Sequence, residues 1–161
     1  MSNTYEVWKY QKFEAENCID GIIDFRKFDE FNMCHTWGAQ APWLALDFGE
    51  NTRVSVERVL LWNRKDNHYD RTRNVRIRLA DKLPTTDGEE FRDGDLLGTF
   101  PGPATRSEKV EISSALGWEN KFGRFLVIQT NVGREEKTYL NFKEVEAFGL
   151  YQPTRCVDDF C

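Results

Sequence analysis

Two arginines flank two aspartates in a short segment that follows one predicted strand and precedes the next. Arg64, Asp66, Asp70 and Arg71 lie within eight residues. The two guanidiniums offer about ten N–H donors in a rigid planar geometry. Such donors suit an acceptor-rich ligand, which is a carboxylate, a phosphate or a set of neighbouring sugar hydroxyls. Because the aspartates would hold the arginines and cancel their charge, the segment favours a neutral polar ligand.

The alternative interpretation of this segment is a solvated surface loop without function. Exposed ion pairs contribute about 0–1 kcal/mol each, and charged loops are common. A single histidine such as His35 is likewise more often structural than functional. The residue types alone therefore leave both interpretations open.

The elements that would position this segment are short strands. Asn74–Leu79 and Lys109–Ile112 alternate apolar and polar residues, as half-buried strands do. The apolar, β-branched run within Arg124–Thr130 predicts a central strand covered on both faces. Further strands are expected at 43–48, 54–62, 96–100 and 138–148, and the last has a bulge or break between Phe142 and Val145. Turn residues separate these segments and no helix longer than about three turns is expected, which predicts an all-β sandwich or barrel.

Composition narrows the classes of protein and of partner. A chain of 161 residues is the size of a single domain. A net charge of -5 argues against nucleic acid as the partner, and no apolar run is long enough to insert in a membrane. The first residues have no charged and no apolar region of a signal peptide. This fits a cytosolic protein or one whose signal peptide has been removed.

The chain has four cysteines and none of them forms a C-x-x-C zinc pair. Cys18 and Cys34 lie near the start, and Cys156 and Cys161 lie in the last six residues. One interpretation is one or two disulfides that tie the C-terminal tail to the N-terminal third. The other is four reduced thiols in an intracellular protein. Three complete pairings exist, and the spacing does not choose among them.

The order of several motifs resembles the F-type lectins (fucolectins), which are related to discoidin or coagulation-factor type C domains. The family has a His followed at a distance by R-x-D-x4-R/K, and Arg64, Asp66 and Arg71 keep that spacing. His35 has six residues between it and Pro42-Trp43, which is also the family's offset. Other similar segments are Asn17-Cys18-Ile19-Asp20-Gly21, Pro42-Trp43-Leu44-Ala45-Leu46-Asp47-Phe48, Val59-Leu60-Leu61-Trp62-Asn63-Arg64 and Lys143-Glu144-Val145-Glu146.

The resemblance implies an eight-stranded β-sandwich (a jelly roll) that binds sugar without catalysis. It implies that His35, Arg64 and Arg71 bond the ring oxygen and axial hydroxyls of α-L-fucose, with the 6-methyl group in an apolar pocket. Asp66 would orient the arginines. The remaining candidates for the sugar site are His68 and Tyr69, as flat surfaces in the loop, and Trp37, as part of an aromatic wall.

Two departures from the family affect its cysteines. The family often has adjacent cysteines in the sugar loop, and Asn67 and His68 stand there in this chain. The family's cysteine also lies two residues before the sugar His, whereas Cys34 directly precedes His35, and the position of its usual partner holds Lys143. The expectation is therefore that Cys156 or Cys161 is the new disulfide partner.

The resemblance also implies a structural calcium ion. Calcium takes six to eight oxygen ligands and accepts backbone carbonyls as well as carboxylates. The corresponding ligands are Asn17, Ile22 and Lys143 through their carbonyls, and Asp20 and Glu144 through their carboxylates. The alternative is that Asp20-Gly21 is an ordinary turn and Glu144 a surface carboxylate.

The sequence thus predicts a secreted or extracellular lectin whose partners are fucosylated glycans or glycoproteins. The expected unit is one domain over 1–161, with a core at about 10–150 and a tail at 151–161 tied by a disulfide. The sequence does not decide whether the protein forms a homo-oligomer. Two alternatives remain, which are a discoidin-type adhesion module for a protein or phospholipid head group and an accessory domain of a larger protein.

Overall fold

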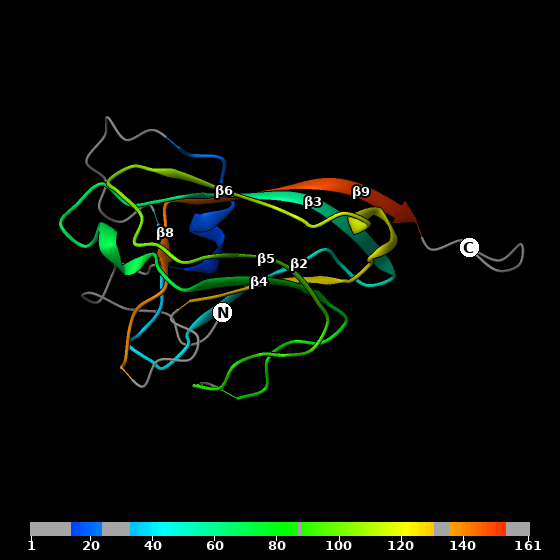
Figure 1. Cartoon of the computed structure of the whole chain (residues 1–161), viewed down its shortest axis with the longest axis horizontal. Coiled ribbons are helices and arrows are strands. Elements are labelled where there is room, and N and C mark those ends of the chain that lie inside the picture. Colours follow the sequence, from blue (N-terminus) through cyan, green and yellow to red (C-terminus); the bar gives the residue numbers. More distant parts are fainter. Residues whose placement is uncertain (1–13, 24–32, 87, 131–135, 154–161) are drawn as a thin grey trace, which may run out of the picture.

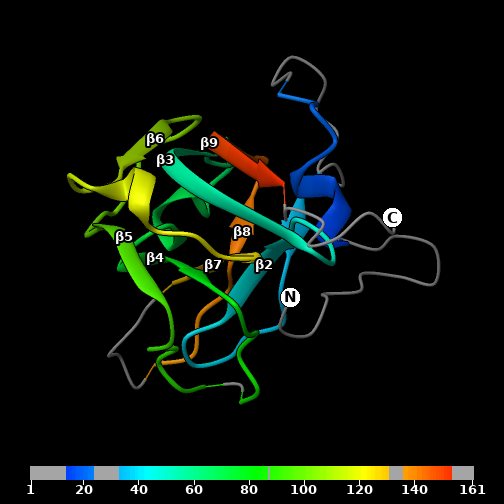
Figure 2. The same ribbon diagram turned by 90° about the vertical axis from the view of Figure 1, so that its right-hand side faces the viewer.

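Two antiparallel sheets face each other in the computed structural model, which describes residues 14–23, 33–86, 88–130 and 136–153 (Figure 1). One sheet has four strands in the order β2-β7-β4-β5, and the other has three in the order β6-β3-β9. A two-stranded ribbon, β1-β8, lies between the sheets (Figure 2). The strands are β1 (Cys34–His35), β2 (Trp43–Asp47), β3 (Thr52–Trp62), β4 (Val75–Ala80), β5 (Asp95–Phe100), β6 (Lys109–Ser113), β7 (Phe125–Gln129), β8 (Asn141–Phe142) and β9 (Glu144–Pro153).

The predicted all-β sandwich is confirmed. Six of the expected strands are present within two residues of their predicted bounds. The strand expected at 138–148 is present as β8 and β9, which together span 141–153, and β1 was not expected. Helix in the described ranges is limited to short 3-10 turns, and no helix there is long and apolar enough to cross a membrane. These turns are η1 (Ala15–Cys18), η2 (Tyr69–Arg71) and η3 (Trp118–Asn120).

Strand β7 occupies the interior position that its apolar sequence predicts. It pairs with β2 on one side and β4 on the other, and all five of its residues are buried. Its outer face is covered by the loop that precedes β5. The Gln129 side chain donates to the carbonyls of Ala41 and Glu89 and accepts from the Phe91 N–H at 2.9 Å. A strand that is covered on both faces needs no polar alternation, which explains its continuous apolar run.

The predicted break between Phe142 and Val145 falls at Lys143. On one side of it, β8 pairs with β1, and on the other, β9 pairs with β3. The Lys143 N–H donates to the Trp62 carbonyl at 2.8 Å, so the chain passes from the ribbon into the sheet at the end of β3. This junction brings the β1-β8 ribbon beside the loop that leaves β3.

The core lies between the sheets. Leu44, Leu61, Ile77 and Ile128 are each 0% exposed and come from four different strands. Each such side chain contributes about 1.5–3 kcal/mol by leaving water. The ribbon adds the side chains of one face only, because directly opposite residues in an antiparallel pair point to the same side. The rigid sandwich that results carries the loops at its ends.

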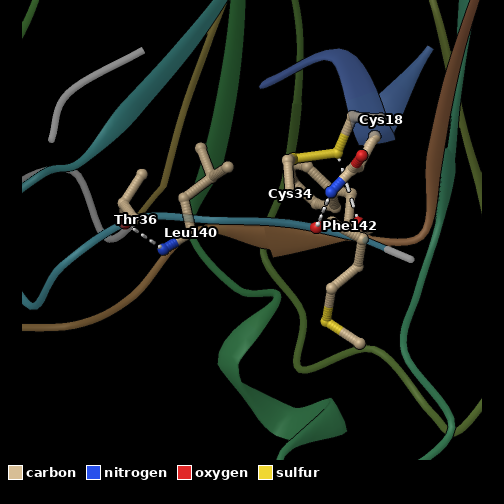
Figure 3. Close-up of a disulfide and its surroundings, with 7 residues drawn as sticks. Cys18, Cys34, Thr36, Leu140 and Phe142 are labelled. Atoms are coloured by element: carbon tan, nitrogen blue, oxygen red, sulfur yellow. Dashed lines mark hydrogen bonds between the residues drawn. A yellow bond between two sulfur atoms is a disulfide. The ribbon is translucent and has the colours of Figure 1, made fainter. Parts of the chain in front are cut away.

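The structure pairs Cys18 of η1 with Cys34 of β1, and the two Cα atoms are 5.2 Å apart (Figure 3). Both cysteines are 0% exposed, and the Cys18 sulfur lies 3.2 Å from the Phe142 carbonyl oxygen. The prediction that Cys34 pairs with Cys156 or Cys161 is therefore wrong. Spacing could not reveal the pairing, because it depends on the N-terminal turn packing directly on β1. The two tail cysteines lie outside the described residues.

Candidate functional site

The candidate sugar loop, residues 63–74, crosses from one sheet to the other. It leaves β3 at Trp62 in the three-stranded sheet and enters β4 at Val75 in the four-stranded sheet. The η2 turn marks the loop at the left end of the sandwich in Figure 1, beside β8. A loop that bridges two sheets is held at both ends by the rigid scaffold, as binding loops often are.

Asn63 fastens this loop from inside. Its side chain is 0% exposed, and its Nδ2 donates to the carbonyls of Tyr69 at 2.9 Å and Thr105 at 2.8 Å. Its Oδ1 accepts from the Thr72 hydroxyl at 2.8 Å. One buried amide thus joins the two ends of the sugar loop to a second loop. Asn63 was not predicted as a site residue, although it directly precedes Arg64.

The second loop, residues 101–108, braces the sugar loop through backbone bonds. The Ala104 N–H donates to the Thr72 carbonyl at 2.9 Å, and the Ser107 N–H donates to the Arg64 carbonyl at 3.1 Å. The close approach requires Gly102, which has φ +63°, because a Cβ there would lie 2.7 Å from the Thr72 carbonyl oxygen. The backbone of Arg64 is therefore held by residues about forty positions later in the chain.

Arg64 and Asp66 form the ion pair that their spacing predicts. The Arg64 Nε donates to Asp66 Oδ1 at 2.5 Å, and its Nη2 donates to Asp66 Oδ2. Burial would raise the pKa of the Asp66 carboxyl, but the bonds from Arg64 and from the His68 N–H outweigh it and lower that pKa. Because Arg64 is only 7% exposed, its charge is compensated inside the protein.

His35 lies in the same buried environment, 6% exposed, on the face of the ribbon away from the core. Burial lowers the pKa of its imidazole to about 4, and the positive charges of Arg64 and Arg71 act in the same direction. The ring is therefore neutral at physiological pH. Its Nδ1 lies 2.7 Å from the Thr36 carbonyl oxygen. Since a carbonyl only accepts, Nδ1 carries the proton and Nε2 is the acceptor of the ring.

Arg71, in η2, is half-buried and stacks on Tyr139. Its guanidinium carbon lies 4.4 Å from the centroid of that ring. Burial, together with the charge of Arg64, lowers the pKa of the Arg71 guanidinium. The same Tyr139 ring meets His35 in an edge contact, with centroids 5.2 Å apart. The structure thus brings His35, Arg64 and Arg71 into one electrostatic environment.

Two side chains in this region have buried polar atoms without a hydrogen-bond partner among the described residues. They are the Nη1 of Arg64 and both polar atoms of the Asn141 amide. Asn141 lies directly opposite His35 in the ribbon, so the two side chains share a face. Buried polar groups are nearly always paired in folded proteins. Water or another bound molecule at this place would complete their hydrogen bonding.

The other predicted sugar-site residues lie around this centre in different ways. His68 is exposed, and its N–H donates to Asp66. The Tyr69 ring faces Arg106 of the bracing loop, 5.2 Å from its guanidinium carbon, so it is already covered by that side chain. Arg106 also donates to the side-chain Oδ1 of Asn67 at 2.7 Å. Trp37 is 49% exposed.

The sequence analysis missed Tyr139 and Asn141. Asn141 lies in β8 and Tyr139 two residues before it, about seventy residues after the sugar loop. The sequence predicts a strand at 138–148 but not the strand with which it pairs. Only the pairing of β8 with β1 places them beside His35. The partial indication was the apolar alternation of Leu140 and Phe142, which leaves Tyr139 and Asn141 on the opposite face.

The candidate calcium ligands include one close pair of carboxylates. Glu144, at the start of β9, is 3% exposed and its Oε2 has no hydrogen-bond partner in the described part of the chain. Burial raises the pKa of Glu144 to about 7, and the Asp20 carboxylate raises it further, while the Gly21 N–H lowers it. Asp20 itself is exposed. Two carboxylates this close repel each other unless a proton or a cation lies between them.

The remaining candidate ligands were expected to act through backbone carbonyls. Asn17 is tied to the residue that precedes β1, because its Nδ2 donates to the Met33 carbonyl at 3.3 Å. Ile22 follows the Asp20 turn, in which its N–H donates to Asp20 Oδ1. Turn η1 packs against β1 and β9, which brings this segment towards Lys143. No group of three or more His, Cys, Asp or Glu side chains that could hold a metal occurs among the described residues.

No protein-family model and no curated protein matches the sequence. The fold is similar to solved structures. The fucolectin from striped bass (Morone saxatilis) serum superposes with a TM-score of 0.71 and 23% identity, over 92% of this chain and 45% of that one. The chain therefore spans less than half of that lectin.

Two further solved structures have the same fold. The lectin domain of lectinolysin, solved with Lewis B antigen, has a TM-score of 0.62 and 21% identity over 85% of this chain and 84% of that one. A fucose binding module of Streptococcus pneumoniae has a TM-score of 0.59 and 18% identity, over 92% and 89%. The predicted resemblance is confirmed at the level of the fold.

Proposed function

We propose that this chain is a lectin domain that binds terminal α-L-fucose on glycans and catalyses no reaction. One observation carries the proposal. The buried, neutral His35 of β1 lies beside Arg64 and Arg71, which the braced sugar loop holds in place. It is supported by structural neighbours that are a fucolectin, a fucose binding module and a lectin domain that binds Lewis B antigen.

The donor and acceptor pattern favours a hydroxylated ligand over an anion. The Nε2 of His35 accepts, so its ligand atom must carry a hydrogen. The guanidinium N–H groups of Arg71 and Arg64 donate to oxygen lone pairs. A sugar hydroxyl satisfies both requirements, since it donates once and accepts twice, whereas a carboxylate or phosphate would place a lone pair against Nε2. The charge of Arg64 is also already compensated by Asp66.

The unpartnered polar atoms support a ligand at this position. Arg64 Nη1 and the Asn141 amide are buried without partners in the described residues, and an unpaired buried group costs about 1–3 kcal/mol. A ligand rich in hydroxyls, or water that the ligand replaces, would remove that cost. We therefore expect Asn141 to lie within the bonding distance of a bound sugar or its water.

The proposal is tested by calorimetric titration with methyl α-L-fucoside, methyl α-L-galactoside and inorganic phosphate. The galactoside differs by one added hydroxyl at C6 and therefore tests the pocket for the methyl group. We expect binding of the fucoside, weaker binding of the galactoside and none of phosphate. Absence of fucoside binding with retained binding to phosphatidylserine vesicles would refute the proposal in favour of a discoidin-type module.

We further propose a structural calcium ion held by Asp20 and Glu144 through carboxylates and by Asn17, Ile22 and Lys143 through carbonyls. The support for it is the buried Glu144 carboxyl beside Asp20, with one oxygen lacking a partner in the described residues. The donor set is all oxygen, as calcium requires. The bound ion would neutralise the carboxylate pair and link the N-terminal turn to β9.

Calcium dependence is measured by the thermal midpoint of unfolding in calcium chloride and in a chelator. A ligand at about one hundred times its Kd adds about 2.7 kcal/mol to stability, so calcium should raise the midpoint by several degrees. An unchanged midpoint would refute the proposed calcium site and would leave the proposed sugar site untouched. Secretion is proposed on the Cys18–Cys34 disulfide, since disulfides persist in oxidising compartments.

A further inference from the structure

The ring of Tyr139 lies between two of the side chains that the proposed fucose site uses. The Arg71 guanidinium carbon is 4.4 Å from the ring centroid, which is a cation–π contact. The His35 imidazole approaches the same ring with centroids 5.2 Å apart and planes at 63°, which is an edge contact. One aromatic side chain thus contacts a donor and the acceptor of the site at once.

The backbone around Tyr139 is fixed from both sides. The preceding residue, Thr138, exchanges two backbone bonds with Ala39, at 2.8 and 2.9 Å. The following residue, Leu140, accepts from the Thr36 N–H through its carbonyl and donates to the Thr36 hydroxyl, both at 3.0 Å. The Tyr139 backbone therefore cannot shift without breaking the pairing with the segment that carries His35.

Gly38 packs against the Tyr139 ring. A Cβ placed on Gly38 would lie 3.2 Å from the Cζ of Tyr139 and 3.4 Å from its hydroxyl oxygen. This is tighter than ordinary carbon contacts. The Tyr139 ring thus has three neighbours, which are the Gly38 backbone, the Arg71 guanidinium and the His35 ring.

We propose, on the basis of the fucose site proposed above, that Tyr139 is its positioning residue, whose ring holds Arg71 and His35 at fixed places relative to each other. Arginine has a long side chain that loses much rotamer freedom on binding. Arg71 also lies near the positive Arg64, which opposes a fixed position of the guanidinium. The electron-rich face of the ring offsets that repulsion and orders Arg71 before the sugar arrives, so that less entropy is lost on binding.

The test compares Tyr139→Phe, which keeps the ring, with Tyr139→Leu, which keeps apolar bulk but removes the ring face. Tyr151→Leu, a substitution of an exposed tyrosine near the far end of β9, is the matched control. Each protein is titrated with methyl α-L-fucoside and its thermal midpoint is recorded. We expect Tyr139→Phe within about threefold of the parent and Tyr139→Leu about tenfold weaker, or 1.4 kcal/mol. The control should bind as the parent does.

A ligand-independent reading separates this inference from the proposed function. The Arg71 guanidinium lies over the ring face. The NMR resonance of the adjacent δ-methylene protons should therefore be shifted upfield in the parent and in Tyr139→Phe, and not in Tyr139→Leu. If the parent binds no fucoside, the proposed function fails, and this resonance still decides whether the ring holds Arg71. If the resonance is unshifted in the parent, or if the Leu and Phe variants bind equally tightly, the positioning role is refuted.

Gly38→Ala provides a second variant in case Tyr139→Leu does not fold. The added methyl group presses on the Tyr139 ring, while Tyr139, His35, Arg64 and Arg71 are not substituted. Displacement of the ring should weaken fucoside binding several-fold and change the Arg71 δ-proton resonance. Parent-like affinity together with an altered resonance would show that the ring position does not set the affinity, which overturns the proposal.

Discussion

Fucoside binding should stay constant from about pH 7.5 down to about pH 5.5, because His35 remains neutral over that interval. Burial lowers the pKa of its imidazole to about 4 from the usual 6.5. Protonation would turn Nε2 from an acceptor into a donor. Its N–H would then point at the hydrogen of the sugar hydroxyl, and no hydrogen bond could form. It would also place a third cation beside Arg64 and Arg71. The protonated site therefore cannot bind the sugar in the proposed way.

The size of the effect follows from the two pKa values. With a pKa of about 4, the ring is about 3% protonated at pH 5.5, so the affinity is unchanged within error. With the usual imidazole pKa of about 6.5, about nine tenths of the rings would be protonated there, and affinity would fall about tenfold between pH 7.5 and 5.5. Below pH 4 the account predicts a tenfold loss for each further pH unit.

The assay is titration of the protein with methyl α-L-fucoside at half-unit intervals of pH, alongside NMR titration of the imidazole protons. The chain has two histidines, and a His68→Asn variant assigns their signals. A loss of affinity centred near pH 6.5, with the His35 signal titrating there, would refute the reasoning about the buried neutral ring. A fall near pH 4 that accompanies the His35 signal supports it.

The same proton affects folding with a defined sign. Because the folded pKa of His35 lies below its unfolded value, the unfolded chain binds the proton first as pH falls. Stability therefore decreases from about pH 6.5 to about pH 4 and then levels off with respect to this group. The lowering of the His35 pKa from 6.5 to about 4 corresponds to about 3 kcal/mol of stability lost. His35→Asn should remove this part of the pH dependence in chemical denaturation.

Three further outcomes are expected. Asn63→Ala should lower the free energy of unfolding by about 3 kcal/mol, because three buried hydrogen bonds are lost. Denaturant titration measures this loss, and an unchanged midpoint would contradict the bracing role of Asn63. Replacing Cys18 and Cys34 together with serine should cost about 3 kcal/mol, because the disulfide closes a loop of about sixteen residues; equal stability of parent and variant would count against it. Glu144→Gln should abolish the rise of the thermal midpoint in calcium, and a full rise would exclude Glu144 as a ligand.

Much of the scaffold follows from local pattern. The continuous apolar run of β7 requires cover on both faces, and the structure supplies it. The change of register between Phe142 and Val145 locates the passage from ribbon to sheet at Lys143. The spacing of Arg64 and Asp66 allows one side chain to bond the other, and they do so. In each case the sequence signal lies within a few neighbouring residues.

The parts that escaped prediction depend on contacts between distant segments. Cys34 bonds Cys18 because η1 packs on β1, and no spacing rule encodes that packing. Tyr139 reaches His35 only through the pairing of β8 with β1. The brace at Gly102 depends on a loop from elsewhere in the chain. Long-range placement of this kind cannot be read from residue types or periodicity.

The most direct test of the central claim is calorimetric titration of methyl α-L-fucoside into the parent protein and into Arg71→Ala and Arg71→Lys. Alanine removes the donors, and lysine keeps the charge but loses the planar fork. We expect saturable binding by the parent and an affinity at least about a hundredfold lower in Arg71→Ala. Arg71→Lys should recover only part of the affinity, and all three proteins should have the same thermal midpoint. Fucoside binding that survives Arg71→Ala undiminished would contradict the placement of the sugar between His35, Arg64 and Arg71.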